Sequence, residues 1–486
     1  MTSFVLRHVR LVEVERGTGH GDQPIHVLVR DGEVAEVGPD VRHPVGMQEY
    51  DADGRWLMPG LWDAHVHLDQ WVLFGQRLDT GAARSPREAA ALVAARLAET
   101  EGPLVGWGHR SATWPEQPTT ALLDEVAGER PVVLISGDGH HGWLNSAGQR
   151  LMGLPPSDGP IAEEPWFAAY SRITEIIPGD LSPSAVQRAL DAAAALGVTG
   201  MVDFEFGVTR SRWADRVAAG VGGMRIRAAT YAEGLDALLA EGLRDGDPGP
   251  GTAGLVTTGP LKIISDGSLN TRTAWCCEPY TDRDDVGAPN LDGTTLRDLM
   301  TRARDGGLQV AVHAIGDRAV AEALVAFAQV DVPGSIEHAQ LVRREDLRQF
   351  ARLGLVASVQ PAHLLDDRVV SEACWTDRTD RCFMLRAMRE HRVRLAMGSD
   401  APVSPLDPWL AIRAAVDRGS VDDPWHPEQA LSLPEALAAS VDGRGTVHAG
   451  MPADLLLLDD DPLGEWTGAP RIAATAVGGV VTHGSL

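Results

Sequence analysis

Through the middle of this chain, short apolar runs alternate with longer stretches rich in alanine, leucine and arginine. The run 198–204 follows the helix-like stretch 184–196, and the run 309–313 precedes the helix-like stretch 318–328. Strands buried in a parallel sheet are apolar along their whole length, and neighbouring parallel strands need crossover connections, usually helices. The alternation therefore predicts repeated βα units and an α/β fold.

Polar residues stand where several of these apolar runs end. The runs 334–338, 355–360 and 394–400 end in His338, Gln360 and Asp400. Polar side chains at the carboxyl ends of parallel strands are typical of a (β/α)8 barrel, which builds its site there. A barrel needs about 250 residues, so a chain of 486 residues has room for one barrel with additions.

The additions fall at three places in the chain. Residues 1–57 and the region 446–486 read as short alternating strands, and Asp31-Gly32 between two such strands is a hairpin signal. Residues from about 68 to 183 are too many for one loop and contain their own helix-like stretch, 85–99, and a strand-like run, 131–136. We interpret this segment as an insertion after the first barrel strand.

Charge and cysteine usage limit the possible partners and compartment. The net charge of −25 (43 basic against 68 acidic residues) disfavours nucleic acid and anionic membrane surfaces as partners. The four cysteines form no CxxC pair, and we interpret them as reduced thiols of a cytoplasmic protein. Apolar runs stay short of the roughly 18 residues that span a bilayer, so we expect no membrane association.

Two histidines close the apolar stretch Leu61-Trp-Asp-Ala-His65-Val-His67. In a strand, residues i and i+2 point to the same side, so both imidazoles can reach one metal ion. The pair alone is a weak signal, because paired histidines on a strand face are often only polar neighbours. Together with polar residues at later strand ends the metal interpretation becomes much stronger: His313, His338, Asp400 and Lys262.

Lys262 is the only lysine in a chain that otherwise uses arginine. A buried lysine can become a neutral, nucleophilic amine, whereas a guanidinium stays charged. A single lysine in an apolar strand therefore suggests chemistry, although drift in an arginine-rich composition would also leave one. Its place at the end of the predicted fourth barrel strand, between the histidine pairs in chain order, favours chemistry.

The motifs around these residues resemble those of the amidohydrolase superfamily, in its YtcJ-like, family 3 branch. The resemblance runs in order along nearly the whole chain through these segments: Pro59-Gly-Leu-Trp-Asp-Ala-His-Val-His, Asp138-Gly-His-His-Gly-Trp-Leu-Asn, Leu261-Lys-Ile-Ile-Ser-Asp-Gly-Ser, Val312-His-Ala-Ile-Gly-Asp-Arg, Ile336-Glu-His-Ala-Gln-Leu, Gly398-Ser-Asp-Ala-Pro and Gly450-Met-Pro-Ala-Asp-Leu. It implies a TIM-like barrel hydrolase domain over 58–445, with the insertion about 68–183. It also implies a small β-sandwich domain formed by 1–57 and 446–486.

The resemblance also implies a ligand set. His65 and His67 would bind a first metal, and His313 and His338 a second or shared one. Asp400 would be a ligand and a catalytic proton shuttle. Lys262, also catalytic, would carry a carboxylate that bridges two metals, since a free ammonium has no lone pair. Neutral imidazoles with oxygen ligands suit Zn²⁺, with Fe²⁺ or Mn²⁺ as alternatives and one or two ions bound.

Six further residues are candidates for substrate contact. His140, Trp143 and Asn145 would come from the insertion, with a buried hydrogen-bonded turn as the alternative. Asp266 could orient Lys262, touch substrate or close a turn. Arg318 could bind substrate next to Asp317, which we expect to cap a helix. His363 follows the seventh strand and could face the pocket.

These features predict a metal-dependent hydrolase of non-peptide C–N bonds in small molecules, such as an amide or an N-formyl or N-acyl amine. A cyclic-amide or imidazolone-type hydrolase is a second possibility on the same scaffold. A non-catalytic sensor that retains the barrel is a third, disfavoured because every ligand position is filled. We expect a small-molecule substrate and, as a default for soluble proteins, a possible homodimer.

Overall fold

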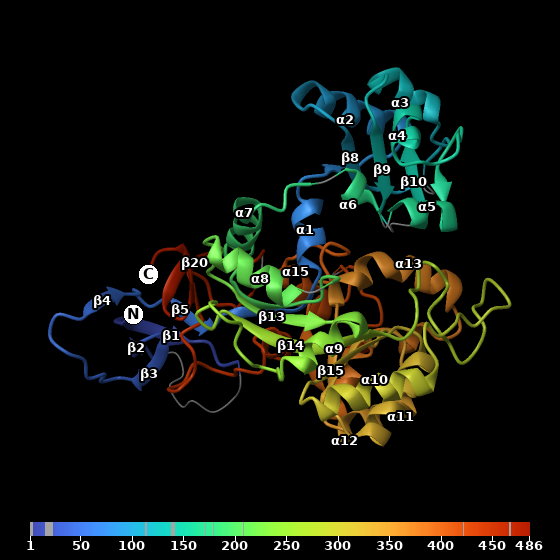
Figure 1. The fold of residues 1–486 in the computed structure, drawn as a ribbon. Coiled ribbons are helices and arrows are strands. Elements are labelled where there is room, and N and C mark those ends of the chain that lie inside the picture. The colour runs from blue at the N-terminus through green and yellow to red at the C-terminus, as the bar shows by residue number, and fades with distance from the viewer. Residues whose placement is uncertain are drawn as a thin grey trace. The chain divides into compact units, whose positions relative to one another are not determined.

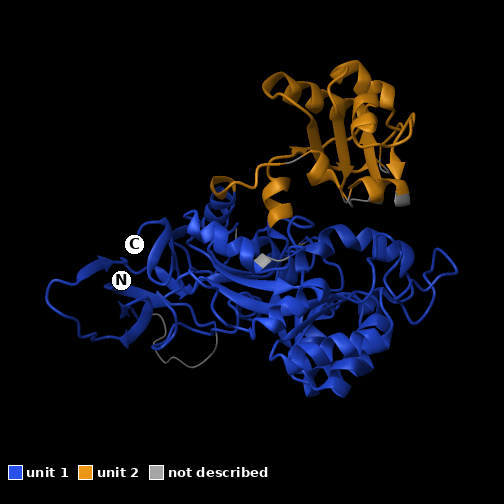
Figure 2. Cartoon of the chain, viewed as in Figure 1, with its two compact units in different colours: residues 1–68, 186–486 blue, residues 69–185 orange. Residues whose placement is uncertain are grey.

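The computed structural model describes residues 3–14, 23–111, 114–137, 141–170, 172–177, 179–207, 209–420, 422–465 and 468–486. The chain divides into two compact units (Figure 2). Unit 1 comprises Met1–Leu68 and Val186–Leu486, and unit 2 comprises Asp69–Ala185. Unit 2 therefore occupies the part of the chain in which the sequence predicts an insertion.

Unit 1 contains eight parallel strands in one sheet, and this confirms the predicted barrel (Figure 1). The sheet order is the chain order, so each strand pairs with the next one along the chain. Lys262 lies on the fourth of these strands, as predicted. The strands are β6 (Leu61–Val66), β12 (Val198–Asp203), β13 (Arg225–Thr230), β14 (Val256–Ile264), β15 (Val310–Ala314), β16 (Gly334–His338), β17 (Val356–Val359) and β18 (Arg394–Met397).

The end of the first barrel strand meets the residues that follow the last one. Val66 and Ala401 form a parallel bridge, and the backbone amide of Asp400 donates to the carbonyl of His65 at 2.7 Å. The buried Asp63 carboxylate accepts from the amides of Ser399 at 2.9 Å and His65 at 3.1 Å. A side chain thus supplies hydrogen bonds that a strand ladder would otherwise make.

Helices between the strands bury one apolar face each. In α11 (Asp317–Val330), Val320, Leu324 and Phe327 are at most 1% exposed and recur at helical spacing. The same arrangement holds for α10 (Gly293–Asp305), α15 (Pro408–Asp417) and α16 (Leu433–Ala439), whose buried residues share one core with the barrel strands. The helix-like stretch 318–328 of the sequence is therefore the body of α11.

Both ends of the chain build a second sheet in unit 1 (Figure 1), as predicted. Strands β2 (Ile25–Arg30) and β3 (Glu33–Gly38) form the expected hairpin, with positive φ at Asp31 and Gly32. From the other end, β19 (Leu455–Leu458) pairs antiparallel with β5 (Trp56–Pro59). The sheet also contains β1 (Phe4–Leu11), β4 (Gln48–Asp51), β20 (Ile472–Val477) and β21 (Val480–Gly484).

Unit 2 has its own five-stranded sheet and its own core. The strands are β7 (Leu78–Asp79), β8 (Leu104–His109), β9 (Val132–Ser136), β10 (His141–Leu144) and β11 (Ile161–Ala162). Helix α2 (Pro86–Glu99) begins after Ser85, whose side chain accepts from the amide of Glu88. Together with α3 (Thr120–Ala127) it buries apolar side chains against the sheet, among them Val93, Leu123 and Leu134.

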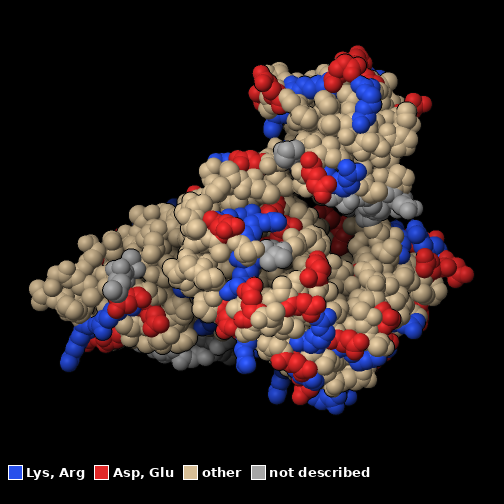
Figure 3. Space-filling model, in the orientation of Figure 1, with Lys and Arg blue, Asp and Glu red and all other residues tan. Residues whose placement is uncertain are grey.

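Charged side chains of both signs are interspersed over the face shown in Figure 3. Among the described residues, no helix is long and apolar enough to cross a membrane.

Candidate metal centre

Strand β6 and the residue after it carry the predicted histidine pair. His65 is 1% exposed, and the His67 side chain is 16% exposed. The Nε2 atoms of His65 and His67 lie 3.5 Å and 3.3 Å from Asp400 Oδ1, which follows the last barrel strand. The first and last strands of the barrel sheet therefore bring two imidazole nitrogens and one carboxylate oxygen close together.

The next histidines come from β15 and β16. The rings of His313 and His338 lie 4.5 Å apart between centroids, and those of His338 and His65 lie 5.1 Å apart. One ligand atom each from His65, His338 and Asp400 all lie within 4.8 Å of one another. The structure thus gathers every predicted imidazole and the carboxylate at the carboxyl ends of the strands. The set of His65, His338 and Asp400, however, combines ligands that were predicted to bind two different metal ions.

The spacing and the unpaired atoms of this cluster fit a divalent metal. Ligands at about 2.1 Å from one tetrahedral zinc lie roughly 3.4 Å apart, which matches the separations from Asp400 to His65 and His67. Within the described part of the chain, Nδ1 of His67 and of His338 is buried without a hydrogen-bond partner. Buried polar atoms normally have partners, and a coordinated ion or its ligands would satisfy such nitrogens.

The backbone is strained at two of the donors. His338 and Asp400 have φ of +70° and +57°, in the left-handed region that non-glycine residues seldom adopt. Strain of this kind costs of the order of 1–3 kcal/mol and is concentrated at functional sites. His338 ends β16 and Asp400 lies three residues after β18, and the side chains of both lie close to the other donors.

Burial keeps the imidazoles neutral. It lowers the pKa of His313 to about 4 and the pKa of His65 and of His338 well below the usual value, with nearby cations adding to the effect. Burial opposes ionisation of Asp400, but the surrounding imidazoles, His65 first, outweigh it and hold the Asp400 pKa well below its usual range. At neutral pH the cluster therefore offers lone pairs and a negative charge, the state in which these groups bind a cation.

A comparison with known proteins decides the family. The sequence profile described as "Amidohydrolase family" matches residues 48–485, which is most of the chain. The chain belongs to the amidohydrolase family. The predicted resemblance is confirmed, and the protein is a metal-dependent hydrolase by family.

Three curated relatives of this amidohydrolase match over nearly their whole length. The protein LONG AFTER FAR-RED 3 of Arabidopsis thaliana is 28% identical and covers 93% of this chain and 87% of its own. Putative amidohydrolase YtcJ of Bacillus subtilis is 28% identical, covering 91% and 92%. The N-substituted formamide deformylase of Arthrobacter pascens is 25% identical, covering 94% of both.

A solved structure supports the same conclusion. An uncharacterized metal-dependent hydrolase from Pyrococcus horikoshii superposes with a TM-score of 0.81 at 26% identity, covering 96% of this chain and 99% of that one. The barrel and the terminal sheet are therefore both shared with a hydrolase described as metal-dependent.

Lys262 of this amidohydrolase lies inside the ligand cluster. It is 2% exposed, its Nζ lies 3.3 Å from His65 Nε2, and it stands 4.2 Å above the Phe204 ring. Burial lowers the Lys262 pKa to about 8, against the opposing charges of Glu337 and Asp400. A neutral amine is therefore readily available at this position.

Glu337 is a site residue that the sequence analysis missed. Its Oε2 lies 2.8 Å from His65 Nδ1, and both side chains are 1% exposed. Strand alternation would place Glu337 and His338 on opposite faces, so a pattern that directs the histidine to the site predicts that the glutamate points away from it. The positive φ at His338 breaks that alternation and lets both side chains face the cluster.

The candidate substrate contacts in unit 1 have different environments. His363 ends η3 (Pro361–His363), and its Nε2 lies 3.8 Å from Asp400 Oδ2, so it borders the cluster and its substrate contact stays a prediction. Arg318 is exposed and its guanidinium packs 4.6 Å above Trp275, which leaves its substrate role a prediction.

Two aspartates nearby are tied to backbone and to loops. Asp266 is fully buried and accepts from the amides of Trp275, Ile315 and Gly316, so it closes the turn before α11, which is one of its three predicted roles. Its Oδ1 also lies 3.4 Å from His313 Nε2, beside the donor cluster, and a substrate contact stays a prediction. Burial raises the Asp266 pKa to about 7. The expected helix cap at Asp317 is wrong: Gly316 is the cap residue, and the Asp317 carboxylate binds Arg381 and the amide of Cys277.

Two of the candidate substrate contacts in unit 2 are buried inside that unit. Trp143 is fully buried in the core of that unit, and its Nε1 donates to the Thr119 carbonyl at 2.9 Å. Asn145, also fully buried, caps α4 (Ser146–Leu151), and its side chain binds the amide of Val132. These contacts agree with the buried, hydrogen-bonded turn that was the alternative to substrate contact, and a substrate contact of either residue stays a prediction. His140 lies outside the described residues.

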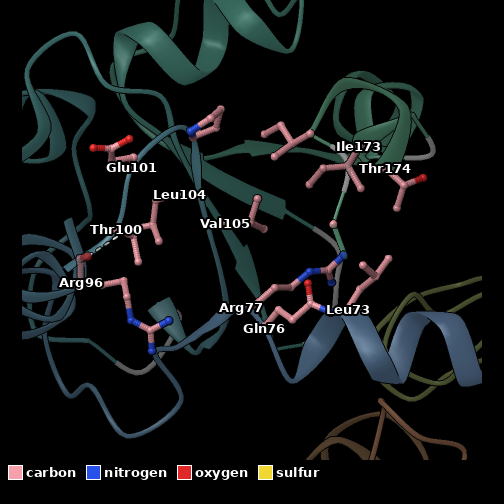
Figure 4. A pocket seen from close by; sticks show the side chains of 13 residues that line it. Leu73, Gln76, Arg77, Arg96, Thr100, Glu101, Leu104, Val105, Ile173 and Thr174 are labelled. Atoms are coloured by element: carbon pink, nitrogen blue, oxygen red, sulfur yellow. Dashed lines mark hydrogen bonds between the residues drawn. The ribbon is translucent and has the colours of Figure 1, made fainter. Parts of the chain in front are cut away.

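Unit 2 also contains a cavity of about 170 Å³, drawn in Figure 4. Arg77, Arg96 and Glu101 contribute its charged groups, and Leu104, Val105 and Ile173 contribute apolar walls. Histidine is not among the lining residues. The cavity is therefore not a second metal centre of the kind found in the barrel.

Proposed function

We propose that this amidohydrolase hydrolyses a non-peptide C–N bond of a small molecule, an amide or an N-formyl or N-acyl amine. The observation that carries the proposal is the convergence of two imidazoles, His65 and His67, on the Asp400 carboxylate at 3.3–3.5 Å. The relative named N-substituted formamide deformylase supports an N-formyl amine as one substrate class.

His65, His67, His338 and Asp400 would hold the ion, with His313 close enough to join. This donor set of nitrogen and carboxylate oxygen favours Zn²⁺, and Fe²⁺ or Mn²⁺ would also be accepted. When bound, a divalent ion supplies Lewis acidity toward a carbonyl and a nucleophilic water at neutral pH. The clustered donors allow one ion or two.

Asp400 would move the proton. Its Oδ1 faces His65 and His67, and its Oδ2 faces His363 at 3.8 Å, so the second oxygen remains free to accept a proton. Asp400 would take the proton of the attacking water and return it to the leaving nitrogen, as a general base and then a general acid. His363, buried beside it, would orient the substrate.

Lys262 would act as a carboxylated ligand. Its neutral amine adds to carbon dioxide, with loss of one proton, to give a carbamate whose two oxygens can bridge two cations. The low exposure and the pKa of about 8 favour the neutral amine that this step requires. An arginine could not replace it, because its guanidinium stays charged.

The state of the cysteines bears on the compartment of the protein. The four cysteines are free thiols, and three of them are buried, which supports a cytoplasmic location. A small-molecule substrate and a possible homodimer complete the proposal.

A substrate screen tests the proposed reaction. N-formyl amines, N-acyl amines, cyclic amides and Xaa-Pro dipeptides are incubated with wild-type protein and with Asp400→Asn. The proposal predicts turnover of an acyclic amide that the variant loses. Turnover of cyclic amides or dipeptides alone would assign a different bond, and equal background rates for both proteins would favour a non-catalytic sensor.

A further inference from the structure

Glu337 has a buried carboxylate directed at the far side of a proposed metal ligand. Its Oε2 lies 2.8 Å from Nδ1 of His65, and each side chain is 1% exposed. The other carboxylate oxygen, Oε1, accepts a hydrogen bond from the hydroxyl of Ser335, two residues earlier on β16. The carboxylate is therefore held at both ends and is not free to rotate away from His65.

The two nitrogens of His65 face chemically opposite neighbours. Nδ1 faces the Glu337 carboxylate, an acceptor, so this nitrogen must carry the proton. Nε2 lies 3.3 Å from Lys262 Nζ and 3.5 Å from Asp400 Oδ1, on the side of the ligand cluster. With the proton on Nδ1, the lone pair of Nε2 points at the other donors.

We propose that Glu337 is a positioning residue that fixes His65 in the Nδ1–H tautomer and so directs its Nε2 lone pair to the metal. A carboxylate on the outer nitrogen of a metal-binding imidazole sets its orientation and raises its basicity, and such partners typically contribute 10–100-fold in metal affinity. The metal part of this inference rests on the proposed function. The tautomer part does not, because it concerns the protein without metal.

A merely structural role for Glu337 makes a different prediction. If the carboxylate only balanced the charge of Lys262, or only filled the interior, its loss would lower stability without changing the tautomer of His65. The variants are therefore Glu337→Leu, which removes every acceptor opposite His65 Nδ1, and Ser335→Ala, which removes the second anchor. The matched control is Asp454→Asn, a fully buried carboxylate paired with Arg225 and Arg444 at the terminal sheet.

The first measurement needs no metal. Proteins carrying ¹⁵N-histidine are treated with chelator, and the ring nitrogen shifts of His65 are assigned from their loss in His65→Gln. The inference predicts a protonated Nδ1 in the wild type and in Asp454→Asn, and a mixed or reversed tautomer in Glu337→Leu. An unchanged Nδ1–H tautomer in a folded Glu337→Leu would overturn it.

The second measurement is Zn²⁺ affinity by competition with a chromogenic chelator. Glu337→Leu should bind zinc about 10–100-fold more weakly, Ser335→Ala should lose less, and Asp454→Asn should match the wild type. Wild-type affinity in Glu337→Leu would contradict the inference. If the wild type itself bound no metal, the proposed function would fail, and the tautomer measurement would still decide the role of Glu337.

Discussion

His67 Nε2 and Asp400 Oδ1 lie 3.3 Å apart, although one follows the first barrel strand and the other follows the last. This contact exists only when the barrel sheet closes between β6 and β18. The buried Asp63 carboxylate stabilises the same junction between β6 and β18, which we call the seam, by accepting from the amides of Ser399 and His65. Closing the barrel and assembling the donor cluster are thus one structural event.

Gly398→Ala should damage the seam and the site together. A Cβ at this position would lie 2.6 Å from the His65 amide nitrogen and 2.9 Å from Asp63 Oδ1, so one strand must move. We expect a loss of about 1–3 kcal/mol in the free energy of unfolding and weaker zinc binding, measured by urea titration and chelator competition. Gly38→Ala, with open space around its Cβ, is the control and should be near neutral.

Asp400→Asn should abolish proton transfer. The amide has almost the same shape but cannot act as a base, so we expect kcat to fall about 10²–10⁴-fold on any substrate found in the screen. Asp407→Asn is the control, because Asp407 caps α15 through its side-chain oxygen and asparagine caps equally well. Full activity in Asp400→Asn would rule out the proton shuttle.

Lys262→Arg should remove metal bridging although it preserves charge. We expect loss of most activity and a lower metal-to-protein ratio, since a guanidinium forms no carbamate. Lys262→Ala supplied with a short carboxylic acid should recover part of both, because the acid can occupy the same space. Unchanged activity and metal content in Lys262→Arg would disprove the carbamate, while a site of histidines and Asp400 with one ion could remain.

Glu435 should make the fold more sensitive to acid. Although burial opposes its ionisation, the bidentate contact with Arg386 and the hydrogen bonds from Ser432 lower the Glu435 pKa to about 2 from 4.5. A lowered carboxylate pKa stabilises the fold fully above about pH 4.5, and this contribution is lost as the pH falls toward 2. Between these values the free energy of unfolding should fall more steeply in the wild type than in Glu435→Gln. Parallel pH profiles would contradict this.

Patterns with a fixed period were predictable from the sequence. Buried parallel strands are apolar throughout, so the barrel strands, the terminal sheet and the order of the donors along the chain followed from residue type and spacing. His65, His313, His338 and Asp400 could be found because they end such strands. The barrel topology brings the carboxyl ends of these strands to one end of the sheet, and the backbone conformations of His338 and Asp400 complete the gathering.

Contacts that depend on a single dihedral angle or on a second element could not be predicted. Glu337 faces His65 only because His338 has a positive φ, which strand alternation does not foresee. For Asn145 the sequence left a pocket contact and a buried, hydrogen-bonded turn both open, and only the structure shows its amide capping a helix and binding β9. For Asp266 it left a turn, a substrate contact and the orientation of Lys262 open, and only the structure shows the carboxylate accepting from backbone amides of a later loop.

The binding of a metal ion by the donor cluster is best tested by an anomalous-scattering map. The crystals are grown from protein purified without chelator and supplied with Zn²⁺. The account predicts one or two peaks at the carboxyl ends of the barrel strands, within about 2.0–2.2 Å of His65 Nε2 and an oxygen of Asp400. Density extending from Lys262 Nζ would show the carbamate. No peak at this cluster in crystals grown with saturating Zn²⁺, or peaks only elsewhere, would contradict it.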